Sequence, residues 1–112
     1  MIPSAYNRLR FETREENKDG FGNVKGEFQP KFSRFATLIF KTGGEGVLAA
    51  RLSGVQPIVI QVYDDSETRT IKANWRAVNE ATGDIYSITS PPMPVRGKRV
   101  MLEMMAQSGV PS

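Results

Sequence analysis

Apolar and polar side chains alternate along most of the chain, with the two-residue period that is typical of a half-buried β-strand. In the first such segment, Leu9, Phe11 and Thr13 alternate with charged residues. The segment PIVIQVY is richer in β-branched residues and is expected to be a well-buried strand. Strands are predicted at 9–15, 28–40, 57–63 and 99–106, and a long hairpin is predicted from 68–80 and 85–89.

Large apolar side chains within these strands are expected to form the core. Phe32, Phe35 and Phe40 are expected there. The predicted hairpin places Trp75 on its inward face with Ile71, Ala73 and Ala77, although a lone tryptophan can also anchor an interface. The methionines near the C-terminus suit either core filling or an adaptable contact surface. They are Met93, Met101, Met104 and Met105.

The run KTGGEGVLAARLSG, residues 41–54, is the only one with helical spacing and predicts a helix over about 44–53. Glu45 complements the positive helix N-terminus, and Gly54 supplies a left-handed stop. Leu48 and Leu52, four residues apart, are expected to face the core. A phosphate-binding loop is disfavoured, because Gly-Lys-Ser/Thr is missing and Glu45 lies where a phosphate would bind.

Three segments are predicted to be exposed loops, and loops on a rigid scaffold are where partners usually bind. Segment 17–26 is rich in glycine, 64–68 is acidic, and 90–98 carries prolines that cannot continue a central ladder. A glycine-rich loop suits a gate, and a proline-rich arm suits docking. The candidate partner or channel residues are Asp19, Gly20, Phe21, Gly22, Asn23, Asp64, Asp65, Pro91, Pro92, Met93 and Pro94.

Length and composition indicate one globular domain. The chain has 112 residues, of which 39% are hydrophobic and 24% charged. We expect a single domain over 1–112 with loose ends at about 1–7 and 107–112. The predicted fold is mainly β: a small antiparallel β-barrel or sandwich with one short α-helix and long exposed loops.

Composition leaves little room for catalysis. The chain contains no cysteine and no histidine, which excludes thiolate chemistry, an imidazole base and most zinc sites. Asp64, Asp65 and Glu67 could offer oxygens to a hard cation, but the spaced pattern of a calcium loop is missing, so a solvated turn is favoured. We therefore expect no enzyme activity, no cofactor and no metal. No signal-peptide core or membrane span is seen, which makes the cytoplasm the default location.

The formal net charge of +3 is mild and the charges are mixed. Two basic groups could line one surface and meet phosphates or an acidic partner, although scattered surface charge explains them equally well. A small β-barrel nucleic-acid-binding module is therefore the alternative function, and it would need exposed aromatic side chains for base stacking. The basic residues are Arg8, Arg10, Arg14, Arg96, Lys98 and Arg99; the aromatic ones are Phe11, Tyr63, Trp75 and Tyr86.

Several motifs occur in a fixed order: LRFETRE, DGFGNVKGEF, GGEGVLAARLSG, IKANWRAVNEATGDIYSITSPP and RVMLEMMA. Their order and spacing resemble the head–tail adaptor or head-closure (stopper, connector) family of tailed phages, whose equivalents occur in gene transfer agents. The resemblance covers almost the entire chain. The matching residues are Gly43, Gly44, Glu45, Ala49, Arg51, Leu52, Gly54, Trp75, Arg76, Gly83, Tyr86 and Ile88.

The resemblance implies a structural virion protein at the head–tail interface, made in the host cytoplasm. It implies a homo-oligomeric, twelve-fold ring between the portal or adaptor ring and the tail-terminator or tail-tube proteins. Such a ring helps to close the channel and retain DNA, with non-specific contact to the packaged DNA and none to a membrane. Because the chain exposes charge and has no long apolar surface run, the isolated protein is expected to be a monomer or weak oligomer.

Overall fold

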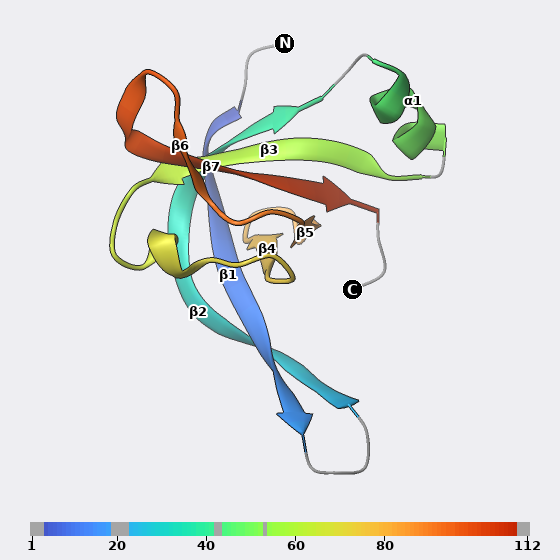
Figure 1. Cartoon of the computed structure of the whole chain (residues 1–112), viewed down its shortest axis with the longest axis vertical. Coiled ribbons are helices and arrows are strands. Elements are labelled where there is room, and N and C mark those ends of the chain that lie inside the picture. Colours follow the sequence, from blue (N-terminus) through green and yellow to red (C-terminus); the bar gives the residue numbers. More distant parts are fainter. Residues whose placement is uncertain (1–3, 19–22, 42–43, 53, 110–112) are drawn as a thin grey trace.

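The computed structural model of the chain describes residues 4–18, 23–41, 44–52 and 54–109, and it is built mainly of β-strands (Figure 1). A single α-helix lies between the second and third strands, and a 3₁₀ turn follows the third. The elements are β1 (Ser4–Lys18), β2 (Asn23–Phe40), α1 (Glu45–Leu52), β3 (Gln56–Tyr63), η1 (Thr68–Thr70), β4 (Arg76–Asn79), β5 (Ile85–Ile88), β6 (Met93–Val95) and β7 (Lys98–Ser108).

The strands close into the predicted antiparallel barrel. Their order is β3-β2-β1-β4-β5-β7-β6, and an additional pairing of β3 with β7 joins the two sides of the sheet. This closing seam is continuous from Gln56↔Ser108 to Tyr63↔Met101. Closure gives β3 and β7 hydrogen-bonded neighbours on both sides and leaves β6 as a short additional strand on β7.

The predicted alternation fills the barrel interior. Leu9 and Phe11 of β1 are fully buried, and β3 buries Ile58, Ile60 and Val62 while its intervening residues point outward. Each such side chain contributes about 1.5–3 kcal/mol when it leaves water. The two-residue period therefore stabilises the barrel by placing apolar side chains on the face that is buried.

Parity along β2 decides which phenylalanines reach this core. Ala36 and Leu38 are buried, and Phe32 and Phe40 lie an even number of residues from them and pack against the core. Phe35 has the opposite parity and is 55% exposed, so the prediction that it is a core residue was wrong. Since successive strand side chains point to opposite faces, the pattern of β2 has room for Phe35 only outside.

The predicted hairpin strand over 68–80 is shorter than expected. Residues 68–70 form η1, and only Arg76–Asn79 are strand. Trp75 lies in the core at 8% exposure, but Ala73 is exposed because the chain turns at Asn74, whose φ is +75°. Asparagine is among the few residues that tolerate this left-handed conformation, which ends the extended backbone there.

Helix α1 occurs where the sequence predicts it. Gly44 and Gly54 flank it with φ of +89° and +82°, as expected for residues at which the chain enters and leaves a short helix. The prediction that Leu48 and Leu52 face the core was wrong, because they are 60% and 81% exposed. The barrel core is already closed by strands, and α1 packs beside β3 instead of covering an open sheet face.

Two predicted loops contain strand. β1 runs to Lys18 and β2 starts at Asn23, so residues 17–18 and 23–26 of the loop expected at 17–26 are paired strand. In the segment expected at 90–98, Met93–Val95 form an edge strand on β7, where Pro94 is tolerated because only one side needs hydrogen bonds. Strand β1 also begins at Ser4 and β7 ends at Ser108, so both extend into the segments expected to be loose ends.

Candidate interaction surfaces

A two-stranded arm, residues 13–18 and 23–30, extends from the barrel (Figure 1). Strand β4 pairs with β1 over Leu9–Glu12, and β3 pairs with β2 over Thr37–Phe40, whereas the β1–β2 pairing continues to Lys18↔Asn23. The arm therefore leaves the barrel as a ribbon. Of the candidate channel residues, Asn23 begins β2; Asp19, Gly20, Phe21 and Gly22 lie outside the described residues.

Cation–π contacts anchor the base of this arm. The guanidinium of Arg14 lies 4.7 Å from the centre of the Phe28 ring, and that of Arg76 on β4 lies 4.0 Å from the same ring. Each such contact is worth about 0.5–1 kcal/mol at an exposed site. The contact of Arg14 thus joins the two strands of the arm, and the contact of Arg76 ties the base of the arm to the barrel.

A buried carboxylate holds β4 against β1 at the same place. Glu12 accepts hydrogen bonds from Nε of Arg10 (2.7 Å) and Nε of Arg76 (2.6 Å). Burial by itself raises the pKa of Glu12, but the two arginine hydrogen bonds and charges outweigh burial and lower that pKa below its usual range. The two-residue period places Glu12 among the outward-facing charges, so the sequence did not predict this buried contact between β1 and β4.

The acidic turn after β3 is internally paired. Oδ1 of Asp65 accepts the backbone N–H groups of Glu67 and Thr68, both at 2.8 Å, and its Oδ2 accepts Nε of Arg34 at 3.0 Å. Burial opposes ionisation of Asp65, yet these hydrogen bonds lower its pKa. In the part of the chain that the structure describes, no cluster of three acidic residues is arranged to hold a metal ion.

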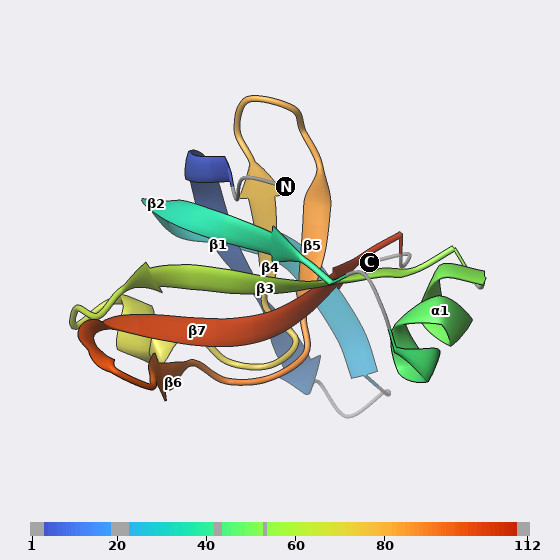
Figure 2. The same ribbon diagram turned by 90° about the horizontal axis from the view of Figure 1, so that it is seen from above.

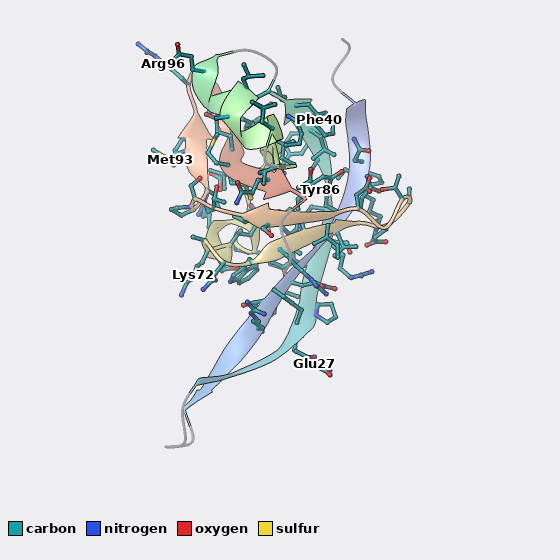
Figure 3. The ribbon with its side chains drawn as sticks, turned by 90° about the vertical axis from the view of Figure 1, so that its right-hand side faces the viewer. Glu27, Phe40, Lys72, Tyr86, Met93 and Arg96 are labelled. Atoms are coloured by element: carbon teal, nitrogen blue, oxygen red, sulfur yellow. The ribbon has the colours of Figure 1, made fainter. Side chains whose placement is uncertain are left out.

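The structure brings the acidic turn and the proline-rich segment to one end of the barrel, on the side opposite α1 (Figures 1 and 2). The backbone N–H of Asp64 donates to the carbonyl of Val100 on β7 (2.7 Å), next to the β6–β7 hairpin. Met93 and Arg96 point away from the barrel here (Figure 3). The exposed apolar side chains of this end are Tyr63, Met93 and Val100.

Helix α1 carries a second group of exposed apolar side chains, Leu48 and Leu52. Its C-terminal side is fixed by a close backbone approach, because a Cβ on Gly109 would lie 2.1 Å from the carbonyl oxygen of Gly54. Helical spacing correctly predicted that these leucines lie on one side of the helix, but the prediction that this side faces the core was wrong. The available signal was that the strands already supplied a complete core.

The four candidate aromatic side chains do not share one exposed surface. Phe11, Trp75 and Tyr86 are buried, and of the four candidates only Tyr63 is exposed. The basic residues on β1 are partly neutralised, since Arg8 lies 3.4 Å from Glu80 and Arg10 is bound to Glu12. The four candidates therefore do not provide the exposed aromatic surface that a nucleic-acid barrel of the stacking type needs.

These features describe a small structural barrel whose exposed groups suit contacts with other proteins. The chain matches the family model of the phage head completion protein over residues 2–109, and it belongs to that family. The predicted resemblance and virion location are thereby confirmed, and the family is one of structural virion proteins. No helix in the described ranges combines the length and apolarity needed to cross a bilayer.

Solved structures share the fold. One is the solution structure of protein SF1141 from Shigella flexneri 2a, with a TM-score of 0.64, 17% identity and 96% of each chain covered. Another is a chain of the virion of the native gene transfer agent particle, with a TM-score of 0.70 and 19% identity, covering 99% of this chain and 100% of that one. The search of curated proteins finds no match.

Proposed function

We propose that this protein forms a homo-oligomeric ring that joins the portal or adaptor ring of a DNA-filled head to the tail-terminator or tail-tube proteins. One observation supports this most: a closed barrel carries the arm, α1 and the β6–β7 hairpin in three different directions (Figure 1). A ring subunit needs separate contacts for its two neighbours and for the assemblies above and below. Family membership supplies the setting for these contacts.

The ring forms on the particle and not in free solution. The exposed apolar side chains of α1 are few, which gives weak self-association, whereas a portal presents many copies of one site and raises the effective concentration. We expect a twelve-fold ring that matches the portal. Light scattering of the purified chain is expected to give the monomer mass; a stable closed ring at micromolar concentration contradicts this assembly order.

The end of the arm is the part that we assign to closing the channel and retaining DNA. The arm is anchored by Phe28 and Glu12 at its base, and the end of β1 and the start of β2 lie away from the barrel (Figure 1). Deleting Asp19–Asn23 is expected to leave the barrel folded while particles leak DNA or fail to join tails. The measurement is electron microscopy of particles together with nuclease protection of their DNA.

A matched control replaces residues 19–22 by four glycine and serine residues, which keeps the length of the arm. If length alone matters, this control makes normal particles; if the side chains matter, it fails as the deletion does. Normal infectious or transducing particles from the deletion variant itself would remove the arm from the channel. Melting of each purified variant confirms that the barrel is intact.

Contact with packaged DNA is proposed as non-specific only. Exposed basic side chains such as Arg96 give weak attraction, and of the four candidate aromatic side chains only Tyr63 is exposed for stacking. We expect weak duplex binding that disappears with moderate salt. Tight binding of single strands with a steep salt dependence would instead support the nucleic-acid-binding module.

A further inference from the structure

A hollow of about 590 Å³ opens between the base of the arm and the segment that includes η1. Phe32 and Trp75 contribute its aromatic side chains, Lys31, Lys72 and Glu67 contribute its charged groups, and Ser66 and Thr70 are among its polar residues. Pockets of about 300–1,000 Å³ with an apolar lining and a few polar groups are the usual size and character of binding sites. The turn η1, whose Thr70 lines the hollow, lies on the side of the barrel away from α1 (Figures 1 and 2).

The aromatic part of the hollow is preorganised. The ring centres of Phe32 and Trp75 are 6.2 Å apart. Trp75 is held on both sides of its backbone: its N–H donates to the carbonyl of Lys72 (3.2 Å), and its carbonyl accepts the N–H of Ile88 (2.9 Å). The left-handed Asn74 beside it donates its N–H to Ile88 as well (2.9 Å). A ligand therefore meets a surface that does not need to be ordered first.

The charges around the hollow are unequal in their freedom. Glu67 is bound by Arg34 at 2.5 Å, and Asp64 is bound by Arg69 at 2.6 Å. Lys31 and Lys72 are exposed and make no ion pair with any described residue; Lys72 points outward in Figure 3. The charges left for a ligand are thus two ammonium groups beside an aromatic surface.

We infer that this hollow binds an acidic peptide segment of a partner protein, with one apolar side chain against Phe32 and Trp75 and adjacent carboxylates on Lys31 and Lys72. A polynucleotide fits less well, because the residues that line the hollow supply two separate ammonium groups and no continuous basic track, and the guanidinium of Arg34 is already held by Asp65 and Glu67. The inference rests on the proposed function only in taking the partner to be another protein of the particle.

The test is an NMR titration of the isotopically labelled full chain, with Trp75 as its single indole reporter. The probe is the terminally blocked peptide Glu-Phe-Glu, and the matched neutral probe is blocked Gln-Phe-Gln. We expect the acidic peptide to shift the Trp75 indole signal and to bind about three- to tenfold more tightly than the neutral one. Equal binding of the two peptides, or no shift at Trp75, overturns the inference.

Paired variants locate the preference. The double variant Lys31→Gln, Lys72→Gln is expected to lose the preference for the acidic peptide with an unchanged melting temperature, whereas Lys41→Gln, outside the hollow, keeps it. Retention of the preference in the double variant overturns the assignment. Competition by a short oligothymidylate that displaces the peptide at lower concentration also overturns it in favour of nucleic acid.

This experiment uses the isolated chain, so its outcome does not depend on ring formation. If rings do not form on particles, the peptide result still stands or falls by itself. If the hollow binds no acidic peptide, the particle assays of the arm and α1 remain as they are. The two proposals therefore fail separately.

Discussion

Helix α1 and strand β3 are consecutive in the chain and both are apolar, yet they use their apolar side chains in opposite ways. Ile58, Ile60 and Val62 of β3 are almost completely buried, whereas Leu48 and Leu52 of α1 are mostly in contact with solvent. Strand β3 has hydrogen-bonded neighbours on both sides, β2 and β7, and its inner face lines the core. Apolar character alone therefore does not decide burial; the topology does.

The difference indicates a division of roles between folding and assembly. Burial of the β3 side chains stabilises the isolated subunit. The leucines of α1 contribute little until another surface covers them, and exposed leucines at helical spacing are typical of a helix that docks into a partner. Under the proposed function, α1 is thus a contact kept for the ring or for the proteins above and below it.

The largest effect is expected at the centre of β3. Ile60→Ala removes a completely buried side chain in a closed barrel that cannot collapse around the cavity, so the free energy of unfolding is expected to fall by about 2–5 kcal/mol. Chemical denaturation of the purified chain measures this loss. A loss of less than about 1 kcal/mol would contradict the conclusion that β3 is a core strand.

A second, smaller effect tests the junction between α1 and the barrel. Gly109→Ala would place a Cβ 2.1 Å from the carbonyl oxygen of Gly54, at a φ of +85°, so both the backbone strain and the clash destabilise the chain. We expect a loss of about 1–3 kcal/mol. Gly97→Ala is the matched control, since φ is +83° there and nothing lies within 4 Å. Equal losses in the two variants would mean that the close approach to Gly54 is unimportant.

A third test extends the comparison to two carboxylates: Glu12, buried between β1 and β4, and Glu27, exposed on the arm. Because the folded-state pKa of Glu12 is lowered, its contribution to stability is complete above the unfolded pKa of about 4.3 and is lost as the pH falls through the lower, folded-state pKa. Glu12→Gln is expected to flatten the decline of stability in acid, measured by denaturation at several pH values. Glu27→Gln, at an exposed carboxylate of the arm (Figure 3), is expected to leave the decline unchanged. Identical acid profiles for the unchanged protein and both variants would contradict a stabilising role for Glu12 between β1 and β4.

The smallest effect on stability is expected in α1. Leu52→Ala changes a side chain that is 81% exposed, so the free energy of unfolding is expected to change by no more than about 0.5 kcal/mol. Under the proposed function the same variant, with Leu48→Ala, yields fewer complete particles in a complementation assay. A loss of stability as large as that of Ile60→Ala, or normal particle yield, would remove the division between the two segments.

The elements that could be predicted from the sequence are those fixed by local patterns. Alternation in β1, the β-branched residues of β3 and the glycines around α1 identify these elements without knowledge of their neighbours. What could not be predicted depends on contacts between distant residues. The direction of Leu48 follows from closure of the barrel by other strands, and the burial of Glu12 follows from Arg76, which lies far along the chain.

The candidate surfaces divide in the same way. Turn and proline signals located the acidic turn and the β6–β7 segment, but not their meeting through Asp64 and Val100. The hollow that Phe32 and Trp75 line could not be predicted from the sequence, since its residues come from the arm base and from the irregular segment after β3. In the sequence its two lysines are ordinary surface charges; the structure adds that the neighbouring carboxylates are already paired with arginines.

The seam between β3 and β7 also sets an order in time. Strands β1 and β2 form a hairpin soon after they are synthesised, whereas Gln56 meets its partner Ser108 only once nearly all the described chain has left the ribosome. Pairing over such sequence distances is slow, on the order of milliseconds to seconds in small β-proteins. A nascent chain that lacks β7 keeps an open sheet edge and an unfilled core. Only a completed subunit therefore offers its finished surfaces to a growing particle.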